Sequence, residues 1–562
     1  EMMNKLLDTM DLERERGITI KLQPVTMHWQ GYSLNLIDTP GHVDFAYEVS
    51  RSLACVEGAI LLVDAPQGIQ AQTIANYELA HAQGLTIVPV INKVDLPAAD
   101  VAGTREELAQ LLHIDQSEIL PISAKSGLGV PEVIARVVAA VPPPLSRPSG
   151  SRALIFDSKY DDFLGVVCSV RVVDGTLKAN ESYELMGSRA RGELLEVGTY
   201  TPKFSAQPLL AAGSIGYVVT GLKDIRLARV GDTLTTSVGS KPDPLPGYRE
   251  VRPMVFAGLF PAVGDDASKL RESLDRLKLN DASLTYEGEH SAALGYGFRC
   301  GFLGLLHLEI TRERLKREYH VEVVVTTPSV AYQVDLTNGS SLLAHSAIEL
   351  PSPDRLAQVR EPLVHADIVT PAAYVGSIMS LVQEYRGTYI TTDYLGHGST
   401  NSRAILRYEL PLGSILVDFY DRLKGVSAGY ASLNYDFARY AECEVRRLDI
   451  LVADEPVEAL ASIVYTDEAY RRARVIVSKL KDLLPRLMFE VKLQASLGGK
   501  VIAAERIPAM RKDVLKKASS GGDVTRKRKL LEKQKKGKRR MRLQGKVAIP
   551  PEAYLALVSR EE

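Results

Sequence analysis

Three short apolar runs, each followed at once by polar residues, constrain the fold of this chain more than any other feature. The runs, at 34–38, 59–64 and 86–91, are rich in Ile, Leu and Val and lead into Gly, Pro, Asn or Asp. Segments with helical spacing come next, such as AQTIANYELAHAQG at 71–84. Alternation of strand, loop and helix predicts a parallel, doubly wound α/β sheet, whose ligands bind at the carboxyl ends of the strands.

The first run leads into the motif DTPGH at 38–42. Asp38 is expected at the carboxyl end of a strand, where its carboxylate can hold a water bound to Mg²⁺. Gly41 has no side chain that would keep a terminal phosphate away from its N–H, and His42 can orient or polarise a water for in-line attack. The motif alone is a weak signal, since an Asp in an ordinary loop after a strand is common.

The third run leads into NKVD, which comprises Asn92, Lys93, Val94 and Asp95. The Asp95 carboxylate can accept hydrogen bonds from the N1–H and N2–H₂ groups of guanine, an edge that adenine does not offer. Asn92 can bond to N7 of the base, and the stem of Lys93 can lie over the ring. The motif favours GTP over ATP, although by itself it can also be a polar loop.

SAKSG at 123–127 follows a further short apolar run, EILPI. The N–H of Ala124 can donate to O6 of guanine, with Ser123 and Lys125 on either side of it. Each of the three motifs alone can be an ordinary polar loop. Together, in this order and each after its own strand, they predict a GTP-binding domain.

The stretch ERERGITI at 13–20 completes the set. Gly17 allows a tight turn, and the hydroxyl of Thr19 can bind Mg²⁺ while its backbone faces the γ-phosphate. A segment of this kind can order with the triphosphate and relax with the diphosphate, which makes a switch. The alternative interpretation is a charged helix end followed by a strand.

The loop that usually cradles the phosphates, G-x-x-x-x-G-K-[ST], does not occur in the 562 residues. The GK pairs at 499–500, 537–538 and 545–546 are followed by Val, Arg and Val. Such a loop belongs upstream of ERERGITI, and the opening EMMNKLLDTMDLERERG reads as the middle of a domain. We therefore expect an N-terminally truncated sequence that, as it stands, binds GTP very poorly and is inactive as a GTPase.

Punctuation by Pro and Gly, together with changes of pattern, divides the chain into several units. VPPPLSRPSG at 141–150 is a Pro-rich linker, and the short β-type runs after it are typical of a β-barrel. We expect a P-loop-type GTPase domain that lacks its first strand at 1–146, a β-barrel at 147–245, two α+β ferredoxin-like domains at 246–330 and 355–443, and a C-terminal domain with a basic RNA-binding tail at 445–562.

The basic tail is the strongest charge feature. Residues 511–546 hold 16 Lys or Arg and 3 Asp or Glu, a local charge of +13 in a chain of net charge −1, so the remainder carries −14. Contact with RNA phosphates explains such density best, although a solvated tail and an anionic membrane surface are alternatives. The expected RNA-binding residues are Arg526, Lys527, Arg528, Lys529, Lys535, Lys536, Lys538, Arg539 and Arg540.

Cysteine usage and hydropathy argue against some other classes of protein. The four cysteines are scattered and form no CxxC pair, which argues against a zinc site or a disulfide framework and fits a reducing compartment. No apolar run reaches the roughly 18 residues that a transmembrane helix needs.

Longer strings carry a resemblance to a known family. DLERERGITIK, DTPGHVDFAYEVSRSL, NKVDLPAAD and SAKSGLGV resemble the translational GTPases. The strings LNDASLTYEGEHSAALGYGFRCGFLGLLHLEI, DFYDRLKGVSAGYASLNYDF and GGDVTRKRKLLEKQKKGKRRM resemble the LepA branch of that family. BipA-type GTPases are the runner-up within the class. The interval between NKVD and SAK is too short for the subdomain that elongation factor G inserts there.

The resemblance implies a ribosome-binding GTPase of translation elongation that uses GTP and Mg²⁺. Its partners would be ribosomal RNA and tRNA, and its action the GTP-dependent movement of tRNAs backward by one codon, which assists fidelity under stress. We expect a cytoplasmic monomer that is partly peripheral on the cytoplasmic face of the cell membrane. The alternative from a different class is a nucleotide-independent scaffold that binds RNA or membranes.

Overall fold

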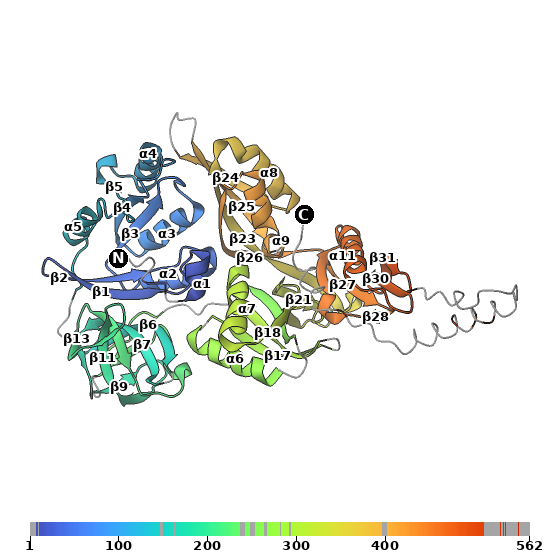
Figure 1. Cartoon of the computed structure of the whole chain (residues 1–562), viewed down its shortest axis with the longest axis horizontal. Coiled ribbons are helices and arrows are strands. Elements are labelled where there is room, and N and C mark those ends of the chain that lie inside the picture. The colour runs from blue at the N-terminus through green and yellow to red at the C-terminus, as the bar shows by residue number, and fades with distance from the viewer. Residues whose placement is uncertain are drawn as a thin grey trace, which may run out of the picture.

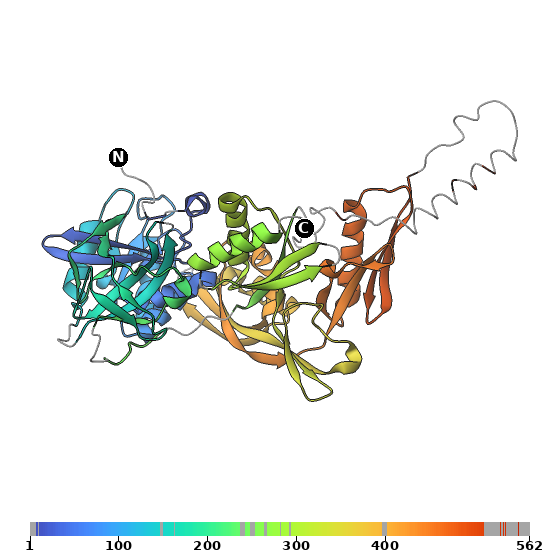
Figure 2. The ribbon, with the colours of Figure 1, turned by 90° about the horizontal axis from the view of Figure 1, so that it is seen from below.

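The computed structural model arranges the chain as a row of folded units, coloured from blue to red in Figure 1. The N-terminal unit and the barrel lie at one end, two α+β units lie in the middle, and the C-terminal unit lies at the other end, as Figure 2 also shows. None of the described helices is long and apolar enough to cross a membrane. The structure describes residues 7–8, 10–145, 150–161, 163–236, 242–247, 253–262, 267–281, 283–291, 294–395, 402–416, 418–510, 529, 532, 534 and 549.

The N-terminal unit is built on a parallel sheet, as its apolar runs predict. The strands are β3 (Gly58–Asp64), β4 (Thr86–Asn92) and β5 (Leu120–Pro121), in the order β3-β4-β5. The helices of this unit are α1 (Asp11–Arg16), α2 (Ala46–Leu53), α3 (Ala71–Ala82), α4 (Val101–Leu112) and α5 (Val130–Ala140). Val90, Ile91 and Leu108 are completely buried, because a parallel sheet has both faces covered.

Residues 34–38 differ from the expectation, because they do not join the parallel sheet. They belong to β2 (Tyr32–Asp38), which pairs antiparallel with β1 (Gln23–Trp29) over its full length. In the part of the chain that the structure describes, no strand bridges β2 and β3. The exposed fractions of Leu36 on β2 and Leu62 on β3, 37% and 51%, agree with this separation.

The second unit is an antiparallel sheet wrapped around one apolar core, as the frequent Gly and Asp turns predict. Its strand order is β10-β9-β15-β6-β7-β14-β11-β12, and β13 pairs with β8 beside it. Cys168, Val170 and Leu234 are among its completely buried side chains. The strands are β6 (Arg152–Asp161), β7 (Gly165–Asp174), β8 (Thr176–Lys178), β9 (Ser182–Leu185), β10 (Arg191–Glu193), β11 (Glu196–Tyr200), β12 (Phe204–Ala206), β13 (Leu209–Ala211), β14 (Ile215–Val219) and β15 (Thr233–Thr235).

The first α+β unit packs two helices on an antiparallel sheet of order β17-β18-β16-β19, with β20 also paired to β16. Helix α6 buries Leu270, Leu274 and Leu277, a spacing that places them on one helical face. The elements are β16 (Val255–Pro261), α6 (Ala267–Asn280), β17 (Thr285–Ser291), β18 (Gly295–Phe302), α7 (Leu305–Tyr319), β19 (Val323–Val325) and β20 (Ser329–Val330).

The second α+β sheet begins at Tyr332, earlier than the expected boundary at residue 355, because β21 pairs with β23 through partners such as Val334 and Val359. Its strand order is β22-β21-β23-β25-β24, and β26 also pairs with β23. The elements are β21 (Tyr332–Leu336), β22 (Ser341–Ala344), β23 (Leu356–Pro371), α8 (Val375–Glu384), β24 (Thr388–Leu395), β25 (Arg403–Pro411), α9 (Leu412–Ile415), α10 (Phe419–Val426) and β26 (Ser432–Glu442).

The C-terminal unit packs one amphipathic helix on a small antiparallel sheet. Its elements are β27 (Val445–Val452), β28 (Glu455–Pro456), β29 (Ser462–Tyr465), α11 (Ala469–Leu483), β30 (Val491–Leu497) and β31 (Lys500–Ile507). Lys529 of the basic tail is helical and exposed. The remaining expected RNA-binding residues lie outside the described residues: Arg526, Lys527, Arg528, Lys535, Lys536, Lys538, Arg539 and Arg540.

Candidate functional site

The two motifs expected to read a guanine base lie side by side. β4 and β5 are neighbouring parallel strands, so the loops after them emerge at the same edge of the sheet. The N–H of Ala124 donates to Oδ1 of Asn92 over 3.0 Å, and the N–H of Val94 donates to the carbonyl of Ile122 over 3.3 Å. The structure therefore brings NKVD and SAK together, as their positions after successive strands predict.

The charged members of these loops are held by local contacts. A hydrogen bond with Ser123, with a smaller contribution from the Lys125 charge, lowers the pKa of the Asp95 carboxyl and keeps it ionised. Ser123 itself is completely buried, which anchors the loop. Lys93 has a left-handed backbone with φ of 62° and forms an ion pair with Asp64 at the carboxyl end of β3. Asp95 thus presents an exposed anionic acceptor.

Oxygen-bearing side chains of three expected or neighbouring residues, Thr19, Asp38 and Asp8, lie near one another. Asp38 ends β2, and burial, followed by the nearby charge of Asp8, raises the pKa of its carboxyl. The hydroxyl of Thr19 donates to Oδ1 of Asp8 over 3.4 Å. Two carboxylates and a hydroxyl are the hard oxygen ligands that Mg²⁺ prefers, and a cation there would favour the ionised form of Asp38, which burial and the charge of Asp8 disfavour. These residues fit a magnesium ion.

A complete metal cage is not formed by side chains alone. Among the described residues, no group of three or more His, Cys, Asp or Glu side chains could hold a metal ion. Mg²⁺ commonly keeps several waters and takes its remaining ligands from substrate phosphates. Thr19, Asp38 and Asp8 would thus supply only part of the coordination of such an ion.

The loop after β2 leaves room for a ligand beside His42. A Cβ added at Gly41 would meet no atom within 4 Å, so the space at this position is open. The imidazole of His42 is 35% exposed, and its Nδ1 accepts a hydrogen bond from the N–H of Asp44 over 3.2 Å. Because Nδ1 is an acceptor, the neutral ring carries its proton on Nε2. His42 therefore offers an N–H donor on its other nitrogen.

The segment ERERGITI is organised by a buried carboxylate that sequence reasoning missed. Helix α1 ends at Gly17, whose φ of 69° is the left-handed conformation that its small size predicted. Glu13 is completely buried, and its Oε1 accepts from the N–H of Ile20 over 2.9 Å and from that of Lys21 over 3.2 Å. Its Oε2 accepts from the N–H of Met10 over 2.9 Å. Glu13 thus holds the backbone on the two sides of this segment together.

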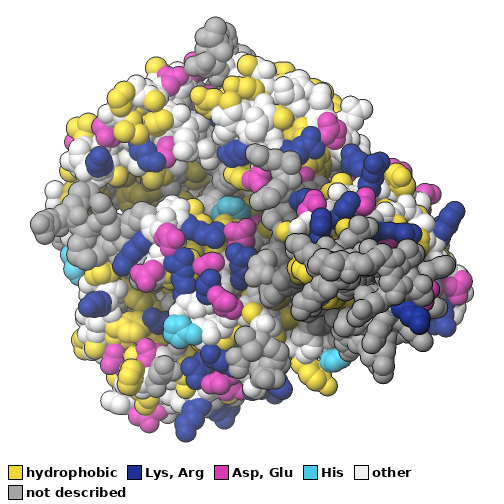
Figure 3. All heavy atoms as spheres, turned by 45° about the vertical axis from the view of Figure 1, so that its right-hand side comes forward, with side chains coloured by type: hydrophobic (Ala, Val, Ile, Leu, Met, Phe, Trp, Pro, Cys, Tyr) yellow, Lys and Arg dark blue, Asp and Glu magenta, His cyan; other side chains and the backbone are white. Residues whose placement is uncertain are grey.

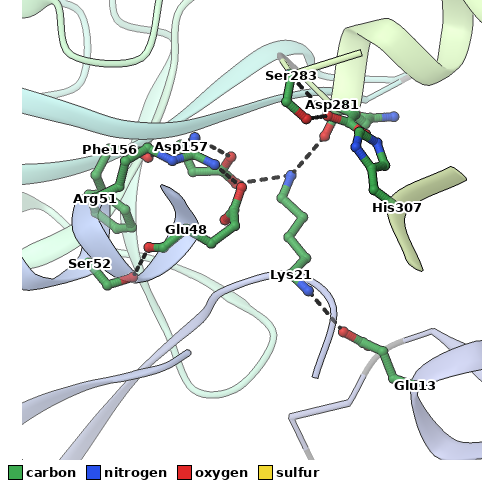
Figure 4. A network of polar contacts seen from close by, with 11 residues as sticks. Glu13, Lys21, Glu48, Arg51, Ser52, Phe156, Asp157, Asp281, Ser283 and His307 are labelled. Carbon is green, nitrogen blue, oxygen red and sulfur yellow. Dashed lines mark hydrogen bonds and ion pairs between the residues drawn. The ribbon is translucent and has the colours of Figure 1, made fainter. Parts of the chain in front are cut away.

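Lys21 connects this segment to two other units (Figure 4). Its Nζ lies 3.1 Å from Oδ2 of Asp157 on β6 and donates to the carbonyl of Asn280 at the end of α6 over 3.4 Å. Asp157 in turn faces Arg51 of α2, which pairs with Glu48. The expected switch segment is therefore tied to both the barrel and the first α+β unit.

Comparison with known proteins gives a consistent assignment along the chain. The family described as the elongation factor Tu GTP-binding domain matches residues 1–143. The elongation factor G C-terminus matches residues 358–451, and the C-terminus of the GTP-binding protein LepA matches residues 452–559.

Two relatives match over nearly the whole chain. Elongation factor 4 of Syntrophomonas wolfei is 49% identical over 567 residues, which cover 100% of this chain and 94% of that protein. Elongation factor 4 of Rubrobacter xylanophilus is 51% identical over 569 residues, which cover 99% of this chain and 92% of that protein. The chain belongs to the elongation factor 4 family. It is a translational GTPase of the LepA type, and its GTP-binding domain is the N-terminal unit.

A solved structure shares the fold of this elongation factor 4 family member. A protein of Thermus thermophilus is 19% identical, with a TM-score of 0.54 over 78% of this chain and 91% of that chain.

Four residues of the candidate site were not expected from the sequence: Asp8, Glu13, Lys21 and Asp44. Asp44 stands two residues after His42 in DTPGHVDFAYEVSRSL, and Glu13 and Lys21 lie in DLERERGITIK, so their positions within these strings were the available signal.

Proposed function

We propose that this elongation factor 4 family member hydrolyses GTP on the ribosome, with His42 orienting the attacking water, and couples hydrolysis to backward movement of tRNAs by one codon. The main support is the hydrogen bond between Ala124 and Asn92, which joins the two base-reading motifs in the same unit as His42. Loops after neighbouring parallel strands emerge at one edge of a sheet in any case, so the support lies in the direct bond between the two motifs rather than in their shared edge.

The base is read by Asp95 and its neighbours. The ionised carboxylate of Asp95 accepts from the N1–H and N2–H₂ groups of guanine, Asn92 bonds to N7, and the stem of Lys93 lies over the ring. Val94 anchors the loop to Ile122, and Ser123 and Lys125 keep Asp95 ionised. The N–H of Ala124 donates to O6, so it has to be shared between the base and Asn92.

Thr19 and Asp38 would hold Mg²⁺, with Asp8 close to Asp38. When bound, such an ion would supply positive charge to the β- and γ-phosphates. The open position at Gly41 lets its backbone N–H approach the γ-phosphate.

His42 orients the water rather than removing its proton. Its Nδ1 is occupied by the N–H of Asp44, so the neutral ring presents Nε2–H. A donor of this kind can hold a water oxygen or a phosphate oxygen in the transition state, where fixed dipoles act most strongly. General-base catalysis through Nε2 would need the other tautomer.

The ribosome is the partner that the charge distribution favours. On the face shown in Figure 3, Lys and Arg side chains are interspersed with Asp and Glu side chains, so the body presents no uniform cationic face in this view. The tail, by contrast, holds 16 Lys or Arg in residues 511–546. Ribosomal RNA attracts such a segment through counterion release. A factor that works on ribosomes acts in the cytoplasm.

The test uses what we call the loop-completed protein: this chain preceded by an N-terminal segment of a relative that carries a G-x-x-x-x-G-K-[ST] loop. It should hydrolyse GTP faster with ribosomes than without them, and it should not use ATP. Asp95→Asn replaces an acceptor with a donor and should shift nucleotide preference from GTP to xanthosine triphosphate, whose base offers an acceptor at that edge. Equal use of GTP and ATP, or no effect of ribosomes, would refute the proposed function.

A further inference from the structure

Asp44 links the loop of His42 to a helix far along the chain. One carboxylate oxygen, Oδ2, accepts from the N–H of Leu306 over 2.8 Å and from that of His307 over 3.3 Å. Both amides belong to the first turn of α7, where backbone N–H groups lack partners within the helix. The carboxylate is only 3% exposed, so water does not compete for these bonds.

Gly304 shows that α7 receives its cap from another unit. Gly304 is the N-cap of α7 and has no side chain to bond to the first-turn amides. A Cβ added there would collide with the carboxylate of Asp44. The glycine thus leaves space for a carboxylate supplied by a residue 262 positions away from Leu306.

A third unit also meets Asp44. The hydroxyl of Tyr435 on β26 donates to Oδ1 of Asp44 over 3.4 Å. Burial, followed by the charge of Asp44, raises the pKa of Tyr435 well above its ordinary value, so the hydroxyl remains a donor. Both α+β units therefore contact this one carboxylate.

The start of α7 is fixed by a second buried contact. Nδ1 of His307 accepts from the N–H of Leu303 over 3.1 Å, and Nε2 lies 2.8 Å from Oδ2 of Asp281. Burial alone would lower the pKa of His307, but the Asp281 carboxylate raises it above its ordinary value. The helix end that holds Asp44 is thus held rigidly within its own unit.

Apolar contacts also connect the His42 loop to α7. Phe45, the residue after Asp44, is buried in a cluster with Leu12 of α1, Ile20 of the switch segment and Ile310 of α7. The switch segment, the His42 loop and α7 therefore share one small core. Movement of α7 would therefore disturb both the switch segment and the His42 loop.

We propose that Asp44 is a positioning residue that makes the orientation of His42 depend on the docking of α7. Its backbone N–H holds Nδ1 of His42, while its side chain caps a helix in the first α+β unit. Docking of that unit on the ribosome would thereby be transmitted to the water that His42 orients. This inference rests on the role proposed for His42.

The competing explanation is that Asp44 only stabilises α7. The variant Asp44→Ala cannot separate the two, because it removes the cap and the link together. The double variant Asp44→Ala/Gly304→Ser can, because the three atoms nearest to a Cβ at Gly304 all belong to the carboxylate that Asp44→Ala removes, and the serine hydroxyl can cap α7 from within its own unit. Asp100→Ala is the matched control: Asp100 caps α4, a helix that follows β4 rather than β2, by accepting from the N–H of Gly103 over 2.9 Å.

Hydrogen exchange on the full 562-residue chain tests the link without any activity. Asp44→Ala should speed exchange about fivefold or more at both 303–309 and 41–47, because each segment loses a hydrogen-bonded contact. The double variant should restore protection at 303–309 only. Restoration of both segments would show that Asp44 acts as a helix cap and nothing more, and would overturn the proposal.

Ribosome-stimulated GTP turnover of the loop-completed protein provides the second readout. The double variant should turn over at least about tenfold more slowly than the parent, with unchanged GTP affinity, while Asp100→Ala should match the parent. His42→Ala is run beside them. If His42→Ala turns over GTP slowly but the double variant turns it over as fast as the parent, the proposed role of Asp44 is refuted. If His42→Ala turns over GTP as fast as the parent, the proposed role of His42 is refuted, and hydrogen exchange alone then decides whether Asp44 links the two segments.

Discussion

Nε of Arg403, on β25 of the second α+β unit, donates to Oε1 of Glu107 on α4 over 3.2 Å. Both side chains are nearly buried, and Arg403 also donates to the carbonyl of Ile69 over 3.0 Å. Burial raises the pKa of Glu107, and the positive charge of Arg403 opposes this rise by stabilising the carboxylate. The N-terminal unit is therefore docked on the second α+β unit as well as on α7.

Arg403→Ala should lower the free energy of unfolding by roughly 3 kcal/mol, because it leaves the buried Glu107 carboxylate without its counter-ion. Urea unfolding measures the loss. The double variant Arg403→Ala/Glu107→Gln should recover part of it. Arg136→Ala, which breaks an exposed ion pair with Glu118, is the control and should cost under about 1 kcal/mol. Equal losses for both single variants would mean that the Arg403 pair contributes no more than surface charge.

A buried carboxyl should make stability depend on pH. Burial raises the pKa of Glu361 on β23 from 4.5 to about 7, and the hydroxyl of Tyr465 on β29 donates to it. The folded-state pKa exceeds the unfolded one, so the stabilisation is complete below pH 4.5 and is lost as the pH rises through 7. The loss should total roughly 3 kcal/mol, at about 1.4 kcal/mol per pH unit.

Glu361→Gln should abolish this dependence. Its unfolding free energy relative to the parent protein should rise between pH 4.5 and about pH 8 and stay level above that. Denaturant titrations across this range provide the comparison. A difference that is constant with pH would show that Glu361 titrates in the folded protein as it does in the unfolded chain, and would contradict the raised pKa.

Local patterns predicted the parts of the fold that depend on near neighbours. β3 and β4 are continuous apolar runs, and the loops after β4 and β5 carry the motifs that the structure joins through Asn92 and Ala124. The expectation that residues 34–38 join the parallel sheet was wrong, because the only described partner of β2 is β1. The sequence of these residues does not indicate which strand pairs with them.

The contacts that could not be predicted join distant segments. Asp44 and Leu306 are 262 residues apart, and an acidic residue within a polar motif gives no sign that it caps a helix in another unit. Glu13 lies in the charged string ERER, which suggests exposure, yet it is completely buried because three backbone amides bond to its carboxylate. Burial of this kind depends on how the chain folds back.

The basic tail should bind RNA through its phosphates. Replacing Arg526, Lys527, Arg528 and Lys529 together with Glu should weaken ribosome binding and lower the slope of log K against log salt by about 2–3 units, somewhat under one unit for each lost contact. GTP hydrolysis without ribosomes should not change. Unchanged binding and slope would mean that the tail is solvated, and loss of binding to anionic vesicles alone would assign it to a membrane surface.

The most direct test of the account is single-turnover GTP hydrolysis by the loop-completed protein and its His42→Ala variant, with and without ribosomes. The variant should bind GTP as tightly as the parent but lose about 10²-fold or more in ribosome-stimulated rate, a loss of roughly 3 kcal/mol in the transition state. Equal rates for the two proteins on ribosomes would contradict the account, because the water would then be oriented without His42.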